Sequence, residues 1–316
     1  MASRVVDPFA SSLDSVVVGG GPAGLSAAIY LARYRRRFLV IDAGAPRAAW
    51  IPLSHNLAGF PDGISGMDLL ARMRKQAKRY GAPVERGRVA SVQKRDGLFV
   101  IRTEEGLEVT ARTVVMATGV IDVEPVLPNL YQAVQRGLIR HCPICDAFEV
   151  IDHRVGVIGH GADAAGEALW MRTYTADVTL LTLGEPLGLD ADERRRMAEA
   201  GIRTIEEPVV EVHTEAGRIT ALTTAAGERL VFESLYSALG CLARADAAKP
   251  TGARLGPTGG FEVDAHCRTD VEDLFAIGDV VEGLNQVSVA MGHAATAATA
   301  IHRLLLKEDG FLAEGD

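Results

Sequence analysis

Residues 15–24 read SVVVGGGPAG, and this stretch decides the fold of the chain. A β-branched run leads into a glycine cluster, a helical pattern follows over residues 25–35, and FLVID at residues 38–42 is a second strand that ends in Asp42. A strand, a glycine turn, a helix and a second strand form one βαβ unit. The stretch therefore predicts an α/β protein built on a parallel sheet.

Three glycines of this turn, Gly19, Gly21 and Gly24, fit the pattern G-x-G-x-x-G. The pattern is weak alone, because the chain has 33 glycines, but here it follows a strand and opens a helix. Gly19 permits the tight turn, Gly21 lets the backbone approach a pyrophosphate, and Gly24 lets the helix pack on the strand. The helix N-terminus faces the anion and Asp42 accepts hydrogen bonds from a ribose. The alternative is a glycine turn that binds no ligand.

A second βαβ unit starts at residue 154, with RVGVIGHG, a helical segment and then DVTLLTLGE. Its turn residues Gly159, Gly161 and Ala164 fit G-x-G-x-x-A. Because the unit occurs twice, the sequence predicts two nucleotide-binding domains of similar architecture.

The segment HCPICDAF, residues 141–148, holds Cys142 and Cys145 with Asp146 directly after them. Two thiols at this spacing can close into a small-ring disulfide that passes electrons by thiol exchange. A structural zinc site needs about four ligands. The remaining cysteines, Cys241 and Cys267, are single and lie in unrelated segments, so no metal site is predicted. We interpret both as buried small hydrophobic residues.

The composition limits the class of protein. The 316 residues suffice for about two domains, and 48% of them are hydrophobic and 23% charged, as in globular proteins. The net charge of −8 and the 5% aromatic content argue against nucleic-acid binding. The N-terminus lacks a secretory h-region and no apolar run is long enough to cross a membrane, so a cytoplasmic location is expected.

The rest of the chain completes the α/β pattern. Residues 66–80 are predicted to form an amphipathic helix, and the short alternating runs over residues 84–115 predict a small antiparallel sheet. The end of the chain reads as a strand, an acidic turn and a long alanine-rich helix.

Further segments match one family: ATG at 117–119, CPICD at 142–146, FAIGDV at 275–280 followed by NQVSVAMGHAATAA, and GFPDGISGMDLLARM at 59–73. From about residue 14 to residue 306 the chain resembles the low-molecular-weight thioredoxin reductases, which are flavoproteins of the pyridine-nucleotide disulfide oxidoreductase group. The resemblance implies two Rossmann-like domains of the three-layer ββα type. It implies a discontinuous FAD domain, residues 1–120 and 250–316, and an NAD(P)-binding-like domain with the redox pair, residues 121–249. It also implies a homodimer.

The resemblance assigns roles by position. Cys145 is the thiol nearer the flavin, Cys142 attacks the substrate disulfide, and Asp146 shuttles a proton. Asp279 touches the ribityl chain, and Gln286 lies at the pyrimidine end of the flavin. The cofactor-binding residues implied for FAD are Gly19, Gly21, Gly24, Asp42, Asn56, Thr118, Gly119, Gly278, Asp279, Gln286 and Val287. Those for NAD(P)H are Gly159, Gly161 and Ala164.

Two further features concern the residue before the cysteine pair and the strand end after the second glycine turn. His141 flanks the pair and could lower a thiol pKa, but we interpret it as a surface histidine. The strand end of the second unit shows Thr182, Leu183 and Gly184, where NADPH enzymes of this kind carry arginines for the 2′-phosphate. The nearest arginines are Arg194, Arg195 and Arg196.

The electron donor and the partner therefore stay open. In one mechanism NAD(P)H reduces FAD, which reduces the Cys142–Cys145 disulfide and then a thioredoxin-like protein. In a second, the donor is a ferredoxin or another flavin. In a third, a small dithiol is oxidised and oxygen accepts the electrons. A non-enzymatic flavin redox sensor is the alternative from a different class.

Overall fold

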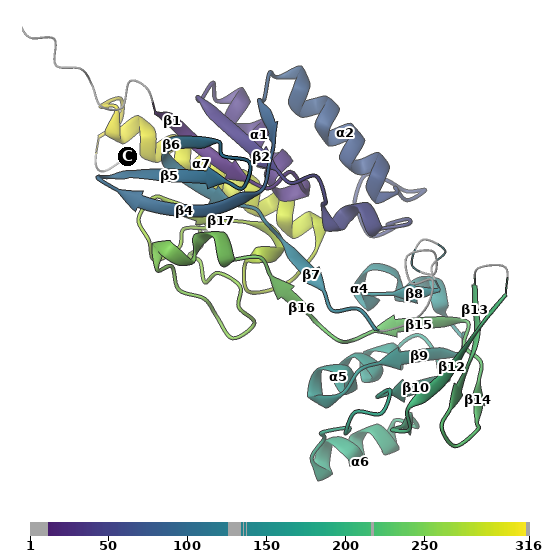
Figure 1. The fold of residues 1–316 in the computed structure, drawn as a ribbon. Coiled ribbons are helices and arrows are strands. Elements are labelled where there is room, and N and C mark those ends of the chain that lie inside the picture. The colour runs from purple at the N-terminus through teal and green to yellow at the C-terminus, as the bar shows by residue number, and fades with distance from the viewer. Residues whose placement is uncertain (1–11, 126–133, 135, 137, 216–217, 314–316) are drawn as a thin grey trace, which may run out of the picture. The chain divides into compact units, whose positions relative to one another are not determined.

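The computed structural model of the protein describes residues 12–125, 134, 136, 138–215 and 218–313 (Figure 1). The chain separates into two compact units. The first contains the chain up to Ala49, Met67–Ile121 and the chain from Leu242, and the second contains Trp50–Gly66 and Asp122–Cys241. The architecture is α/β, as predicted. The domain boundaries at residues 120 and 250 stay a prediction.

The first unit is built on a parallel sheet in the order β3-β2-β1-β6, with β17 on the other side of β6. Val17 of β1 lies opposite Val40 of β2 and Val115 of β6, and all three are fully buried. Strands buried on both faces read as near-continuous apolar runs, which explains SVVV and FLVID. The strands of this sheet are β1 (Leu13–Val18), β2 (Phe38–Asp42), β3 (Val84–Arg86), β6 (Glu108–Met116) and β17 (Leu274–Ala276).

Strand β6 belongs to two pairings. Its first half pairs antiparallel with β5 (Leu98–Thr103), which pairs antiparallel with β4 (Val89–Arg95). Its second half pairs parallel with β1 and β17. The small antiparallel sheet expected over residues 84–115 is thus β4, β5 and the start of β6, whereas β3 pairs parallel with β2.

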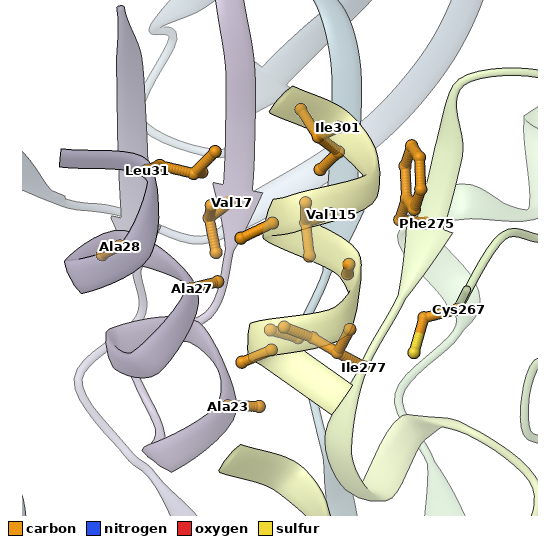
Figure 2. Packing of buried hydrophobic residues seen from close by; sticks show 14 of the residues in the cluster. Val17, Ala23, Ala27, Ala28, Leu31, Val115, Cys267, Phe275, Ile277 and Ile301 are labelled. Atoms are coloured by element: carbon orange, nitrogen blue, oxygen red, sulfur yellow. The ribbon is translucent and has the colours of Figure 1, made fainter. Parts of the chain in front are cut away.

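The helices of the first unit cover this sheet. Helix α1 (Pro22–Arg33) starts with proline in its first turn, where no intrahelical N–H is needed. Figure 2 shows Ala23, Ala27 and Leu31 of α1 beside Val17 and helix α7 (Val287–Glu308), whose Ile301 is fully buried. Each large aliphatic side chain buried there contributes roughly 1.5–3 kcal/mol. The other helical segments are α2 (Gly66–Arg79), η1 (Arg47–Trp50), η3 (Asp246–Thr251) and η4 (Gly278–Val280).

The second unit repeats the plan with a five-stranded parallel sheet in the order β11-β10-β9-β15-β8. A separate antiparallel sheet joins β12, β13 and β14. The strands are β8 (Ile139–Arg140), β9 (Val155–Ile158), β10 (Val178–Leu181), β11 (Arg203–Ile205), β12 (Val209–Glu215), β13 (Arg218–Thr224), β14 (Arg229–Leu230) and β15 (Ser234–Ser237). The helices are α4 (Pro143–Asp146), η2 (Ala147–Val150), α5 (Gly161–Met171) and α6 (Ala191–Glu199). Two further strands, β7 (Val120–Asp122) and β16 (Cys241–Ala243), pair with each other where the chain crosses between the units.

Candidate functional site

The first glycine turn connects β1 to α1 and needs two of its glycines for its own geometry. Gly19 has φ +116°, and a Cβ there would lie 2.3 Å from the Ala117 carbonyl oxygen. A Cβ on Gly24 would lie 1.8 Å from the Gly19 carbonyl oxygen. At Gly21, in contrast, a Cβ would meet, among the described residues, only the Pro46 Cβ, at 3.9 Å. Packing within the protein therefore does not require glycine at residue 21, and the space in front of it is open.

The acid at the end of β2 is fixed against this turn. The Asp42 carboxylate accepts hydrogen bonds from the backbone amides of Gly20 (3.2 Å) and Gly44 (3.0 Å). A Cβ on Gly20 would lie 2.4 Å from that carboxyl group, so the acid stands directly over the glycine cluster. Asp42 lies where an acid that binds a ribose is expected.

Two other predicted FAD residues lie in the same unit, close to groups that the sequence did not single out. Asp279 in η4 forms an ion pair with Arg47 at 3.1 Å, and both side chains are mostly buried. The Thr118 hydroxyl donates to the Arg244 carbonyl at 2.7 Å, so its proton is already used in a hydrogen bond within the protein. Arg47 carries no motif of its own and could not be recognised from the sequence.

The remaining FAD residues of the first unit lie at backbone turns and a helix start. Gly119 and Gly278 both have positive φ, +67° and +72°. Gln286 is the N-cap of the 22-residue helix α7, and Val287 is its first residue.

Asn56 differs from the other residues that were grouped with FAD. It belongs to the second compact unit, and its side-chain amide donates to the Ile144 carbonyl of α4 at 3.2 Å. The side-chain oxygen of Asn56 accepts from the Ser54 hydroxyl at 3.0 Å. The structure thus places Asn56 against the redox segment.

Cys142 and Cys145 form a disulfide at the start of α4. Cys142 is the N-cap residue, Pro143 begins the helix, and the Cys145 amide donates to the Cys142 carbonyl at 3.0 Å. Two apolar side chains of this segment are open to solvent, Ile144 at 45% and Phe148 at 73% exposure. The predicted disulfide is present, and it is flanked by apolar surface.

Asp146 is held by two donors after the disulfide. Its carboxylate accepts a hydrogen bond from the Tyr236 hydroxyl (2.9 Å) and lies 2.8 Å from the Arg140 guanidinium. Burial raises the pKa of Asp146, while Arg140 and the Tyr236 hydrogen bond oppose the rise. The sequence identified Asp146 but neither donor, because β8 and β15 meet at this acid only in the folded sheet.

The second glycine turn is covered by its own chain. A Cβ on Gly159 would lie 2.7 Å from the Ala164 Cβ, so this pair packs tightly as in the first turn. The Gly161 amide, at the start of α5, donates to the Leu187 carbonyl at 2.8 Å. The Leu187 amide in turn donates to the Glu206 carboxylate at 3.1 Å. Segment 184–190, between β10 and α6, therefore contacts the turn at the amide that would bind a pyrophosphate. We call it the seated segment.

The three arginines that follow this turn in the sequence, Arg194 to Arg196, already have partners. Arg194 donates to the Leu189 carbonyl (3.2 Å) and lies 3.5 Å from Glu206. Arg195 and Arg196 pair with Asp192 of their own helix α6. None of the three is held in place for a 2′-phosphate at the end of β10.

Two expectations about single residues need correction. His141 is not a surface histidine, because its side chain is 14% exposed and lies 3.6 Å from the Glu124 carboxylate. Cys241 is half-buried rather than buried. Cys267 is buried as expected, and burial raises its pKa to about 11. Within the described ranges, no group of metal-ligating side chains is assembled, and no helix is both long and apolar enough to span a membrane.

Comparison with known proteins agrees with this geometry. A family model described as pyridine nucleotide-disulphide oxidoreductase matches residues 13–294. The chain belongs to this family.

Individual members of the family are similar over most of their length. The thioredoxin reductase of Treponema pallidum is 31% identical over 91% of this chain and 95% of its own. The crystal structure of HlmI has a TM-score of 0.86 and 31% identity, covering 94% of each chain. The thioredoxin reductase of Streptococcus pyogenes has a TM-score of 0.85 and 25% identity, covering 94% of this chain and 99% of its own. The protein is a thioredoxin reductase-like flavoenzyme, and its two Rossmann-like units are those of the family.

The residues of the first unit fit the FAD that the family implies. The open space at Gly21 and the acid over the turn match a dinucleotide bound at a helix N-terminus. The ion-paired Asp279 in η4 is a polar group that can face the chain between the two cofactor halves. At the second turn the Gly161 amide is already bound by the Leu187 carbonyl, although a Cβ on Gly161 would meet no described atom within 4 Å.

Proposed function

We propose that the protein transfers electrons between bound FAD, the Cys142–Cys145 disulfide and the disulfide of a thioredoxin-like protein. The observation that carries the proposal is the disulfide at the start of α4, followed directly by a carboxyl group held by Tyr236 and Arg140. The thioredoxin reductases among its relatives support the choice of partner. The exposed Ile144 and Phe148 offer the apolar surface on which a folded partner can dock.

The exchange follows thiol chemistry. Bound FAD supplies an electron pair to the disulfide or accepts one from the dithiol. In the reduced pair, the Cys142 thiolate attacks one sulfur of the partner disulfide, and the other partner sulfur leaves as a thiolate. Cys145 then attacks Cys142, which restores the disulfide and releases the partner with both electrons. Asp146 gives or takes the proton that each sulfur needs, because burial raises its pKa above the ordinary value of a carboxyl group.

The test is reduction of a thioredoxin-like protein by the FAD-loaded enzyme, with electrons supplied to the flavin by dithionite or light. We expect the partner to be reduced, and Cys142→Ser to abolish the transfer while the flavin is still reduced. Cys145→Ser is expected to trap a mixed disulfide through Cys142. Transfer that persists without either cysteine would overturn the proposal. Mass measurement in solution tests the proposed homodimer.

A second candidate follows from the covered second turn. We propose that NAD(P)H is not the efficient donor, and that the same centre oxidises a small dithiol and passes the electrons to oxygen. The contacts that favour it are Gly161 with Leu187 and Leu187 with Glu206, which leave a carboxylate beside the place of a phosphate. The reaction balances as dithiol plus oxygen giving disulfide plus hydrogen peroxide.

Anaerobic titration of the flavin distinguishes the reductase from the dithiol oxidase. Flavin that bleaches with NADPH or NADH in a rapid-mixing experiment supports the reductase and contradicts the second candidate. Flavin that bleaches only with small dithiols, together with oxygen uptake and peroxide formation, supports the oxidase. Bleaching by reduced ferredoxin but by neither of these would contradict the oxidase and identify the donor.

A further inference from the structure

Helix α5 carries a carboxyl group on the face that packs into the second unit. Counted from the glycine turns, Glu167 stands eight residues after Gly159, as Ala27 stands eight residues after Gly19. Ala27 is fully buried in the core of the first unit, and Ala164 and Ala168 beside Glu167 are fully buried too. The Glu167 Oε1 is buried, and it has no hydrogen-bond partner among the residues that the structure describes. An acid therefore occupies a place that the matching helix fills with a methyl group.

The neighbour of this acid is the carboxyl group at the redox pair. Helix α5 packs against α4, which carries Asp146. Burial and the Asp146 charge together raise the pKa of Glu167 to about 7. When two carboxyl groups interact in this way, they share their protons as a pair.

The hydrogen bonds decide which of the two acids keeps the proton. Tyr236 and Arg140 both donate to Asp146 and so stabilise its ionised form. Burial and the Asp146 charge raise the pKa of Tyr236, so its hydroxyl stays protonated and remains a donor. Glu149 also faces Asp146, as a further carboxylate that opposes ionisation. No described residue donates to the buried oxygen of Glu167, and Glu167 is therefore the member that holds the proton.

We propose that Glu167 is a positioning residue for the redox pair, which stores one proton beside Asp146 and passes it through Asp146 to the sulfur released when the disulfide opens. This inference rests on the proposed exchange at Cys142 and Cys145. In the step, an attacking thiolate forms a new bond to the Cys142 sulfur, and the bond between the two cysteines breaks. Glu167 passes its proton to Asp146, and Asp146 passes it on to the Cys145 sulfur, which leaves with the electron pair. The negative charge of the attacking thiolate thus ends on the Glu167 carboxylate.

The test measures how fast dithiothreitol opens the Cys142–Cys145 disulfide of the FAD-loaded protein in the absence of oxygen. The pH is varied between 6 and 8, and the concentration of dithiothreitol thiolate is kept constant. Thiols are trapped by rapid alkylation and counted by mass. The protonated fraction of a group with a pKa of about 7 falls about tenfold over this range, and we expect the opening rate to fall with it. In Glu167→Gln the rate should change less than about twofold, because the amide cannot ionise. Glu167→Asp should restore the decrease of the opening rate with rising pH.

Glu149→Gln is the matched control, because it also removes a carboxylate that acts on Asp146. The opening rate of this variant should still decrease as the pH rises from 6 to 8. An equal loss of the fall in both glutamine variants would mean that charge around Asp146 controls the rate, and it would overturn the proposal. A wild-type rate that does not fall between pH 6 and pH 8 would overturn it without any variant. A pair that dithiothreitol cannot open at any pH would overturn the proposed exchange itself.

Discussion

The two glycine turns of this protein share a sequence pattern and differ in what lies in front of them. In the first, Gly21 faces open space and Asp42 stands over the turn. In the second, the Gly161 amide already binds Leu187, and Thr182 stands where the first unit has Asp42. The pattern of small residues therefore determines the backbone of the turn, while binding depends on neighbours from distant parts of the chain. The helices that follow the turns also differ at one matching position, where the first has Ala27 and the second has Glu167.

The largest effect is expected where the pattern serves packing. Gly24→Ala places a Cβ 1.8 Å from the Gly19 carbonyl oxygen, so helix α1 must move away from β1. We expect a loss of at least about 3 kcal/mol in the free energy of unfolding and little bound flavin. Gly166→Ala in the middle of α5 is the control, because nothing lies within 4 Å of its added Cβ. It should stabilise the protein by about 0.5–1 kcal/mol in denaturant titrations.

The second effect concerns the acid in α5 and has a defined sign with pH. The pKa of Glu167 is raised from 4.5 to about 7, so the folded protein binds a proton that the unfolded chain releases. Its contribution is present below pH 4.5 and is lost as the pH rises to about 7, a change of about 3 kcal/mol. The stability of Glu167→Gln relative to wild type should therefore rise over this window. A difference that stays flat across these pH values would show that α5 tolerates the acid in ionised form.

A smaller effect separates binding from packing in the first turn. Gly21→Ala adds a Cβ that meets the protein only at 3.9 Å, so the stability of the flavin-free protein should change by less than about 0.5 kcal/mol. The same methyl group occupies the approach of a pyrophosphate. We expect FAD to bind about tenfold more weakly, or about 1.4 kcal/mol, in a fluorescence titration. Unchanged affinity would mean that the open space at Gly21 does not serve the cofactor.

The smallest effect is expected for charge at the second turn. Glu206→Gln removes the carboxylate near Leu187 but keeps an oxygen that can accept from its amide. The ion pair with Arg194 is half-exposed, so stability should change by less than about 1 kcal/mol. Flavin reduction by NADPH should rise no more than severalfold, because segment 184–190 stays in place. A hundredfold rise would show that charge, and not the seated segment, closes the turn.

Local patterns predicted much of this structure. The strand FLVID coincides with β2, the helix expected over residues 66–80 is α2, and the close cysteine pair forms a disulfide. These features depend on residues within one or two turns of the chain. The ion pair of Arg47 with Asp279 and the Tyr236 donor at Asp146 join residues that are far apart in sequence. His141 was misjudged for the same reason, since the Glu124 carboxylate beside its ring comes from a separate segment of the chain.

The seated segment on the second turn has a consequence for the life of the protein in a cell. A site that is open without its cofactor gains stability when the cofactor binds, in proportion to the logarithm of its concentration. We therefore expect the stability of the first unit to depend on the supply of FAD. In the second unit the Gly161 amide is already bound by the Leu187 carbonyl, so we expect NAD(P)H to add less stability there. Flavin starvation should thus direct proteolysis to one half of the molecule while the half that carries the redox pair remains folded.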